Sequence, residues 1–382
     1  MATSGADEPI ALIGPHPPFR GGIAHFTERV GSGLQQVGHL VLAISFSRLY
    51  PGVLFPGRSQ VEGDVATDSD PVCAIDSIDP FSWARTAKLI LDRGATAAVF
   101  MYWMPFFAPA YCTIASKLRK RGVRIVGLVH NAIPHERHPG DRLLTRRFLR
   151  TCDSVIVLSE SVRNDVRSLV PGATVRVQPH PVYDQFGEPI AREAARERLD
   201  IDESTPMLLF FGIVRPYKGL NVLLDALPSV LIDRPDAILV IAGEFYEDVE
   251  KYRAQISRLD VGNHVLLVDQ YIPTDEVRDY FCSADVVVQP YIAATQSGVI
   301  AIARHFGVPI VATDTGGLAK AIGESGIAVS PGDSEELGNA IRIQLSSTQA
   351  RLPNVDRPSG GPEDSWKNFA EELLKGISGL DG

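Results

Sequence analysis

Short runs of apolar, largely β-branched residues recur along the 382-residue chain, separated by stretches with helical periodicity. The runs do not alternate between apolar and polar side chains, which is typical of strands in a parallel sheet covered on both faces. Each half of the chain therefore predicts a doubly wound α/β domain. The expected strands are residues 10–13, 40–44, 97–101, 125–129, 154–158, 207–211, 238–242, 265–268, 286–289 and 310–313.

Two irregular, proline-rich stretches divide this pattern, at residues 179–190 and 352–364. The first is typical of a linker between domains. The second precedes an amphipathic helix that repeats large apolar side chains from Trp366 to Ile377 along one side. We therefore expect three parts: an N-terminal Rossmann-like domain over 1–182, a C-terminal one over 183–364, and a final helix over 365–382 that packs back on the first domain.

The charge is distributed unevenly. The net charge is −9, but residues 1–183 carry 20 Lys and Arg against 15 Asp and Glu, and the remainder is strongly acidic. Two helical stretches concentrate the cations: Lys117, Arg119, Lys120, Arg121 and Arg124, then Arg142, Arg146, Arg147 and Arg150. One interpretation is peripheral attachment to an anionic membrane, and the other is an ordinary solvated surface. Nucleic-acid binding is not expected, because the chain is acidic overall and has no stacking motif.

Compartment signals are few. Four scattered cysteines without a Cys-x-x-Cys spacing predict reduced thiols. No apolar stretch has the length of a membrane span, and the first residues show no secretory pattern. We expect a cytoplasmic protein, with attachment at the inner face of the membrane as the alternative.

The loop after the first strand reads PHPPFRGG and includes Gly21 and Gly22. Loops at the carboxyl ends of parallel strands bind ligands, and a helix N-terminus favours an anion. The spacing does not fit the G-x-G-x-x-G fingerprint, which argues against a dehydrogenase.

A histidine-rich loop, VHNAIPHERHPG, follows the strand that ends at residue 129. His130, His135 and His138 do not have a standard zinc-ligand spacing, so we expect no metal. His130 comes directly after the strand and can bond a sugar hydroxyl or a phosphate. A merely structural role is the alternative for all three.

Two segments of the second half have the chemistry of a diphosphate site. In FFGIVRPYKGL, Arg215 and Lys218 lie between a buried strand and a helix, and such cations bind diphosphate oxygens. The P-loop pattern is missing. In the turn ATQSG, Ser297 or Thr295 can cap the next helix, leaving N–H groups from Gln296 through Gly298 to Val299 for a ligand.

These segments together resemble glycosyltransferase family four, whose members have the GT-B architecture of two Rossmann-like domains facing across a cleft. The likeness is carried by Lys218-Gly219 after a strand and by residues 307–317, GVPIVATDTGG, after the second turn. The Gly21-Gly22 loop, His130 and the crossover to a final helix extend it over most of the chain.

The resemblance implies a retaining transfer of a hexose-type sugar from a nucleoside diphosphate sugar without a bound metal or other cofactor. UDP is the first expectation for the nucleotide and GDP the second, in glycan or glycolipid biosynthesis. It implies that Arg215 and Lys218 neutralise the leaving diphosphate, that His130 contacts the donor sugar, with Thr295 and Gln296, and that the Gly21-Gly22 loop closes over the diphosphate. The nucleotide base is expected beside Gly243, Glu244, Tyr271 and Ile272.

The chain departs from the family pattern at two places. A pair of glutamates usual on the donor helix is replaced by Ala294 and Ile302, and an arginine usual after the strand glycine is replaced by Ile213. Arg215 is expected to supply the missing positive charge. The lost glutamates leave open a non-catalytic protein that binds a nucleotide sugar or a glycan, or a different enzyme such as an epimerase or phosphorylase.

The acceptor is not identified by the sequence. Arg20, Trp103 and Phe106 follow strands of the first domain and are the acceptor candidates. The alternative for the two aromatic residues is that they fill the core.

Overall fold

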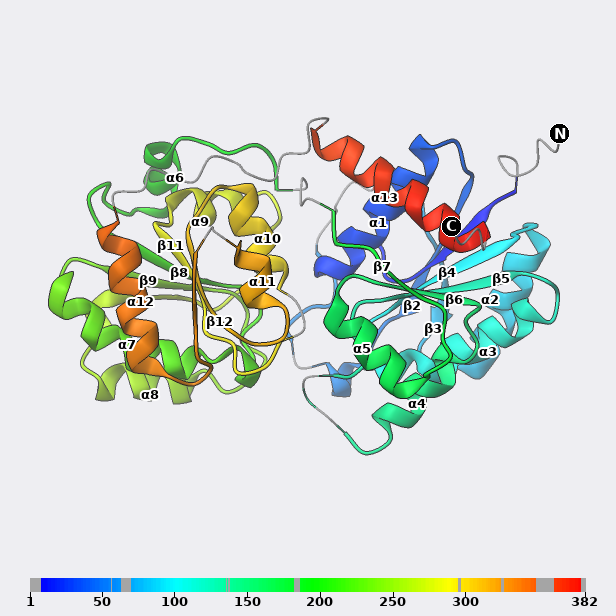
Figure 1. The fold of residues 1–382 in the computed structure, drawn as a ribbon, viewed down its shortest axis with the longest axis horizontal. Helices are drawn as coiled ribbons and strands as arrows, with labels where there is room; N and C mark the ends of the chain where they lie inside the picture. Colours follow the sequence, from blue (N-terminus) through cyan, green and yellow to red (C-terminus); the bar gives the residue numbers. More distant parts are fainter. Residues whose placement is uncertain are drawn as a thin grey trace. The chain divides into compact units, whose positions relative to one another are not determined.

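The computed structural model describes residues 8–55, 57–62, 70–134, 136, 138–181, 186–294, 297–323, 326–347 and 361–378. The chain divides into two compact units, one formed by Met1–Pro181 with Pro358–Gly382 and the other by Val182–Arg357. We call them unit 1 and unit 2. Figure 1 shows a twisted sheet flanked by helices in each of them.

Unit 1 is built on a parallel seven-stranded sheet with the order β3-β2-β1-β4-β5-β6-β7. Its strands are β1 (Ile10–Ile13), β2 (Val41–Arg48), β3 (Val72–Asp76), β4 (Ala97–Tyr102), β5 (Arg124–Val129), β6 (Ser154–Val157) and β7 (Val175–Val177). Its helices are α1 (Gly22–Gln36), α2 (Pro80–Asp92), α3 (Ala108–Arg119), α4 (Asp141–Leu149), α5 (Glu160–Leu169) and α13 (Gly361–Ser378), with short 3-10 turns at Gly52–Leu54 and Pro105–Phe107.

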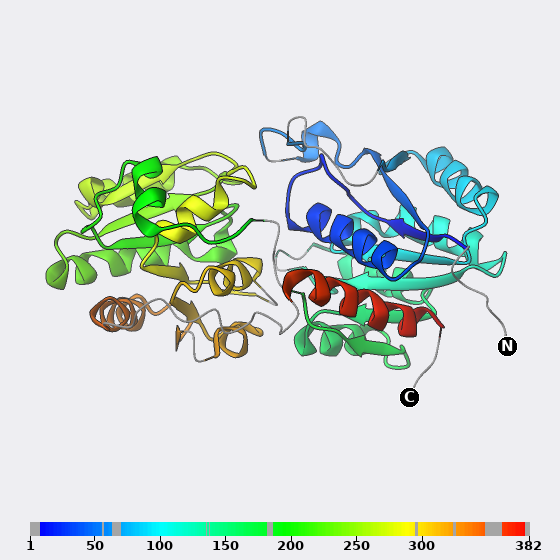
Figure 2. The ribbon, with the colours of Figure 1, turned by 90° about the horizontal axis from the view of Figure 1, so that it is seen from above.

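Different helices cover the two faces of the unit 1 sheet. Successive strand residues point to opposite faces, so neighbouring residues of one strand belong to different core clusters. In β1, Ala11 and Ile13 join the core beneath α2 to α5, whereas Ile10 and Leu12 pack with α1 and α13. Trp366 of α13 is 2% exposed, and its ring lies 5.4 Å from that of Phe26 in α1. The last helix therefore completes the core of the first unit (Figures 1 and 2).

Unit 2 has a parallel six-stranded sheet with the order β10-β9-β8-β11-β12-β13. Its strands are β8 (Met207–Phe211), β9 (Ile238–Ala242), β10 (Val265–Val268), β11 (Val286–Gln289), β12 (Ile310–Thr313) and β13 (Gly326–Val329). Its helices are α6 (Arg192–Leu199), α7 (Leu220–Asp233), α8 (Glu250–Arg258), α9 (Val277–Ser283), α10 (Gly298–His305), α11 (Leu318–Ile322) and α12 (Ser334–Ser346), with 3-10 turns at Pro216–Lys218 and Gly262–His264.

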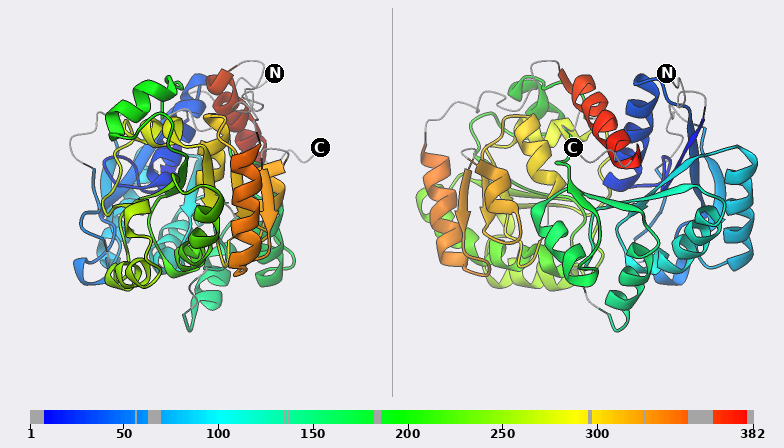
Figure 3. Two further views of the ribbon diagram at one scale, coloured as in Figure 1. Left: turned by 90° about the vertical axis from the view of Figure 1, so that its left-hand side faces the viewer. Right: turned by 45° about the vertical axis from the view of Figure 1, so that its right-hand side comes forward.

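The same alternation divides the core of unit 2. Met207, Leu209 and Phe211 of β8 pack with α6, α9 and α10, and Leu208 and Phe210 pack with α7, α8 and α12. Figure 3 shows these helices on the two sides of the sheet. The predicted doubly wound α/β fold is confirmed. No helix within the described residues has the length and hydropathy to span a membrane.

Candidate functional site

The carboxyl edge of the unit 2 sheet brings the loop after β8 beside the start of α10. Gly212, which ends β8, has a φ of +92°. A Cβ placed on it would lie 3.2 Å from Lys218 Nζ and 3.8 Å from Val299 Cγ2. Two segments that lie about eighty residues apart in the sequence therefore meet around one glycine, where backbone and ammonium can approach a ligand closely.

Lys218 is a buried cation in this site. Its side chain is 8% exposed, and within the described residues it has no hydrogen bond and no carboxylate partner. Nζ lies 5.6 Å from the centre of the Tyr291 ring, a cation–π contact. Burial, reinforced by the nearby Arg215, lowers the pKa of Lys218 from 10.5 to about 7. Because a buried charge without a counter-charge is costly, this site favours an anionic ligand.

Arg215 extends the positive charge toward β9. Its guanidinium carbon lies 5.0 Å from the centre of the Tyr246 ring. The backbone joins the same two loops, since Val214 N–H donates to the Glu244 carbonyl (2.9 Å) and Tyr246 N–H donates to the Val214 carbonyl (3.0 Å). These bonds hold the Arg215 loop against the residues that follow β9.

The Lys218 loop is also tied to the loop after β11. Gly219 has a φ of +67°, and a Cβ there would lie 2.0 Å from the Pro290 carbonyl oxygen. Ile292 N–H donates to the Tyr217 carbonyl (2.7 Å), and Thr313 Oγ1 at the end of β12 donates to the Tyr291 carbonyl (2.6 Å). The loops after three strands thus fix the position of Lys218.

The start of α10 differs from the prediction. Ser297 occupies the N-cap position, but its side chain makes no capping bond and instead donates from Oγ to Gln289 Oε1 (2.7 Å). Of the two predicted caps, Ser297 or Thr295, the first was wrong, because the Ser297 hydroxyl bonds the buried Gln289 instead. Gly298 and Val299 therefore open a helix that Ser297 does not cap with its side chain. Thr295 and Gln296 lie outside the described residues.

Ala294 and Ile302, which replace the expected glutamates, belong to the apolar core. They are 8% and 6% exposed and pack in the cluster beneath α6, α9 and α10. The residues around the start of α10 are therefore apolar where the family resemblance implies carboxylates.

The predicted base-binding residues follow two neighbouring strands. Gly243 has a φ of +153°, and a Cβ on it would lie 2.3 Å from the Gly212 carbonyl oxygen, so β8 and β9 end in close backbone contact. Glu244 is buried. Gly243 N–H donates to the Val268 carbonyl (3.1 Å), at the end of β10. Tyr271 and the buried Ile272 follow β10, so all four residues lie toward this end of the sheet.

The site residues predicted in unit 1 also follow its strands. Gly21 precedes α1 with a φ of +101°, and Cβ atoms on Gly21 and Gly22 would meet nothing within 4 Å. His130 follows β5, with its ring edge-on to Phe26 at 4.8 Å. Its Nε2 is buried and has no hydrogen-bond partner among the residues that the structure describes, and burial, with His180 nearby, lowers its pKa to about 3. The His130 ring is therefore neutral at physiological pH.

The other candidates of unit 1 have different surroundings. His138 is exposed and lies 3.8 Å from Asp141, and His135 lies outside the described residues. Arg20 Nη1 donates to the Ser59 carbonyl (3.3 Å). A nearby aromatic group was missed by the sequence analysis: Trp103 Nε1 donates to Tyr50 Oη (3.2 Å), and the Tyr50 ring is stacked on that of Phe106 at 5.9 Å.

Trp103 and Phe106 are half-buried against the core of unit 1, which fits the core-filling alternative as well as an acceptor role. Among the described residues, no group of His, Cys, Asp and Glu is arranged to hold a metal ion.

Two family models match the chain, one in each unit. The model described as Glycosyltransferase Family 4 matches residues 20–186, and the model described as Glycosyl transferases group 1 matches residues 205–347. Curated relatives are the D-inositol 3-phosphate glycosyltransferases of Geodermatophilus obscurus, 29% identical over 53% of this chain and 47% of that protein, and of Catenulispora acidiphila, 29% identical over 67% and 66%. The matches span about half to two thirds of these relatives' length.

Solved structures share the fold. Sucrose-phosphate synthase from Thermosynechococcus elongatus has a TM-score of 0.68 at 19% identity, covering 98% of this chain and 94% of its own. The Anabaena protein HepE, in complex with UDP and glucose, has a TM-score of 0.67 at 16% identity, covering 98% and 100%. At such identities the likeness concerns the fold alone. Because the two matched models together cover most of the sequence, this chain belongs to the family-four type of glycosyltransferases with the GT-B fold.

Proposed function

We propose that the protein transfers a hexose-type sugar, with retention of anomeric configuration, from a nucleoside diphosphate sugar to an acceptor that is still to be identified. UDP is the first choice of nucleotide and GDP the second. The observation that carries the proposal is Lys218, a buried ammonium that has no carboxylate partner in the described residues and lies near Val299 at the start of α10. A diphosphate supplies the counter-charge that this site lacks.

In the proposed reaction, the bond between the sugar carbon and the diphosphate oxygen breaks as that carbon bonds an acceptor hydroxyl oxygen. Negative charge develops on the leaving diphosphate, which takes up the acceptor's proton. Lys218 and Arg215 neutralise that charge, and the N–H groups of Gly298 and Val299, which Ser297 does not cap, donate hydrogen bonds to the diphosphate oxygens. This preorganised positive charge takes the place of a metal ion. The proposal therefore expects turnover to persist in the presence of a chelator.

For unit 1 the proposal assigns His130 to the donor sugar. Its low pKa keeps the imidazole neutral, so one ring nitrogen donates and the other accepts a hydrogen bond. The buried Nε2 without a protein partner fits a role in contacting a hydroxyl group. The proposal gives this histidine a positioning role, without proton transfer.

Support also comes from the relatives. Those named above are glycosyltransferases that act on D-inositol 3-phosphate by name, and the HepE structure contains UDP and glucose. The proposal takes from them a nucleotide-sugar donor.

The test is nucleotide release from UDP- and GDP-sugars mixed with candidate acceptors. The proposal expects release with one donor, and a loss of at least a hundredfold in Lys218→Ala and Arg215→Ala. Unchanged turnover in both variants would overturn the site assignment. Saturable binding of a nucleotide sugar, with no release across the acceptor panel, would instead favour the non-catalytic binding protein that Ala294 and Ile302 leave open.

A further inference from the structure

Unit 1 gathers cations on one surface formed by α3 and α4. Residues 101–150 contain ten Lys and Arg but two Asp and Glu. The C-terminal ends of the two helices lie side by side, with a shallow surface pocket of about 300 Å³ between them. The pocket is lined by Ser116, Arg119, Lys120, Arg150 and Thr151. The pocket thus brings the ends of the two basic stretches together, on the helices α3 and α4 that Figure 1 labels.

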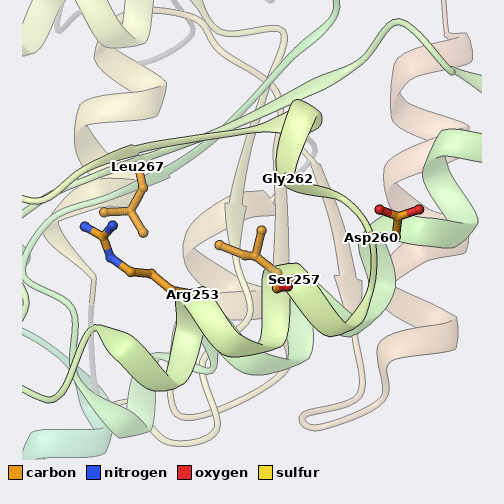
Figure 4. Close-up of a pocket in the computed structure, with 6 residues that line it drawn as sticks. Arg253, Ser257, Asp260, Gly262 and Leu267 are labelled. Atoms are coloured by element: carbon orange, nitrogen blue, oxygen red, sulfur yellow. The ribbon is translucent and has the colours of Figure 1, made fainter.

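Most of these cations have no partner within the described part of the chain, unlike Arg253 and Arg258 on α8 of unit 2. Arg253 on α8 lines another open pocket (Figure 4), but it pairs with Glu250 at 3.3 Å, and Arg258 pairs with Asp225 at 3.4 Å. On α3 and α4, Arg119 pairs with Asp153 at 3.1 Å. Within the described residues, seven neighbouring exposed cations have no ion pair or hydrogen bond from their side chains: Lys117, Lys120, Arg121, Arg142, Arg146, Arg147 and Arg150.

The outer face of α4 combines charge with an exposed apolar side chain. Leu143, Arg146, Arg147 and Arg150 follow the spacing of one helical face, and Leu143 is 69% exposed. Thr145, Phe148 and Leu149 face the core instead. This face therefore offers cations for headgroup phosphates together with one aliphatic side chain that can enter the bilayer interface.

We propose that this basic face, defined as the seven unpaired cations and Leu143, docks on an anionic lipid surface. The cations bind the headgroup phosphates, and Leu143 enters the boundary between headgroups and acyl chains. A lipid surface fits better than a nucleic acid, since the face exposes an aliphatic side chain among its cations and has no aromatic residue for stacking on bases. The inference goes beyond nucleotide binding and does not depend on it.

The test is co-sedimentation of the whole protein with vesicles of phosphatidylcholine, with and without phosphatidylglycerol, at low and high salt. The proposal expects binding to the anionic vesicles at low salt and loss of that binding at high salt, because salt screens exposed charges. Arg146→Gln with Arg147→Gln is expected to lower the partition coefficient roughly tenfold or more. The matched control, Arg253→Gln with Arg258→Gln, is expected to bind as the unaltered protein does.

Leu143→Gln separates a bilayer from a soluble polyanion. It is expected to weaken vesicle binding severalfold while the salt dependence remains. Three results would overturn the proposal: no binding to anionic vesicles at low salt, equal binding to pure phosphatidylcholine, or unchanged binding of the Arg146 and Arg147 double variant. The same variants should retain stabilisation by UDP or GDP, so a failure of membrane docking is distinguishable from a failure of the nucleotide site.

Discussion

The Pro290 carbonyl oxygen occupies the space in which a side chain at Gly219 would lie, 2.0 Å from the position of its Cβ. This contact holds the loop after β8 against the loop after β11, directly beside Lys218. The glycine is required twice, for its φ of +67° and for this close approach. The position of the buried ammonium thus depends on a backbone contact between segments that lie far apart in the sequence.

Gly219→Ala is therefore expected to lower stability by about 2–4 kcal/mol and to weaken nucleotide binding, because one of the two loops must move. Gly332→Ala is the matched control. Gly332 also has a positive φ, +81°, but a Cβ there meets nothing within 4 Å, so the expected cost is about 1 kcal/mol. Denaturant unfolding and titration with UDP and GDP measure both effects. Equal losses in the two variants would contradict the role given to the Pro290 contact.

The affinity for a nucleoside diphosphate is expected to depend on pH through Lys218. Its pKa of about 7 in the free protein means that the ammonium is charged below about pH 7 and increasingly neutral above it. A bound diphosphate favours the charged form and returns the pKa toward 10.5, so binding takes up a proton above pH 7. Affinity is then expected to fall by about tenfold per pH unit from pH 7 upward.

Lys218→Met is the control for this pH dependence, because the phosphate group of the ligand titrates equally with both proteins. The variant should bind weakly, with an affinity that does not change between pH 7 and 9. Calorimetry in buffers with different ionisation enthalpies measures the proton uptake directly. A pH-independent affinity in the unaltered protein would exclude a shifted Lys218.

Stability of unit 2 is expected to depend on Arg196 in α6. This guanidinium is fully buried and donates to the carbonyls of Asp202, Glu203, Thr205 and Ser283 and to the Asp285 carboxylate (2.9 Å). Arg196→Met removes a buried donor that bonds all five acceptors, although Asp285 keeps its ion pair with Arg192 (2.6 Å), and should cost about 3–5 kcal/mol.

The control for Arg196 is Arg198→Met on the same helix. The Arg198 side chain is 49% exposed and pairs with Asp279 at 2.8 Å, so the expected change is within about 1 kcal/mol. Chemical unfolding, followed by far-ultraviolet circular dichroism, compares the free energies of unfolding of the two variants. Comparable stabilities would show that the buried network contributes little.

The docking of α13 is expected to support unit 1. Trp366→Ala removes a ring that packs on Phe26 in the core and should cost about 3–5 kcal/mol. The exposed neighbour Lys367 provides the control, since Lys367→Ala should leave the melting temperature nearly unchanged. If both variants melt like the parent protein, α13 does not stabilise the first unit.

The strand pattern was predictable where strands are central. All ten predicted strands are present. Nine of them are central strands, which are buried on both faces and have a continuous apolar run, whereas β10 lies at a sheet edge and was predictable from its own apolar run, Val265–Val268. The three strands that the sequence did not predict, β3, β7 and β13, all lie at sheet edges. β7 has three half-buried residues and β13 begins with Gly326, so neither has the composition of a buried strand.

The site was predictable to the extent that its chemistry is local. Arg215 and Lys218 were predicted as diphosphate ligands because two cations follow a buried strand and precede a helix, and that role stays a prediction. The aromatic rings of Tyr246 and Tyr291 beside these cations were missed, since each comes from a different loop of the sheet edge. Ser297 does not cap α10 with its side chain, because its hydroxyl bonds Gln289, eight residues earlier at the end of β11.

The central claim is that unit 2 binds a nucleoside diphosphate through Lys218. Calorimetric titration of UDP and GDP near pH 7 into the unaltered protein, Lys218→Met and the exposed-lysine control Lys251→Met tests it most directly. We expect saturable binding of one nucleotide, a loss of about tenfold to a hundredfold in Lys218→Met, and an unchanged affinity in Lys251→Met. Equal affinities of Lys218→Met and the unaltered protein, or no binding of either nucleotide, would contradict the account.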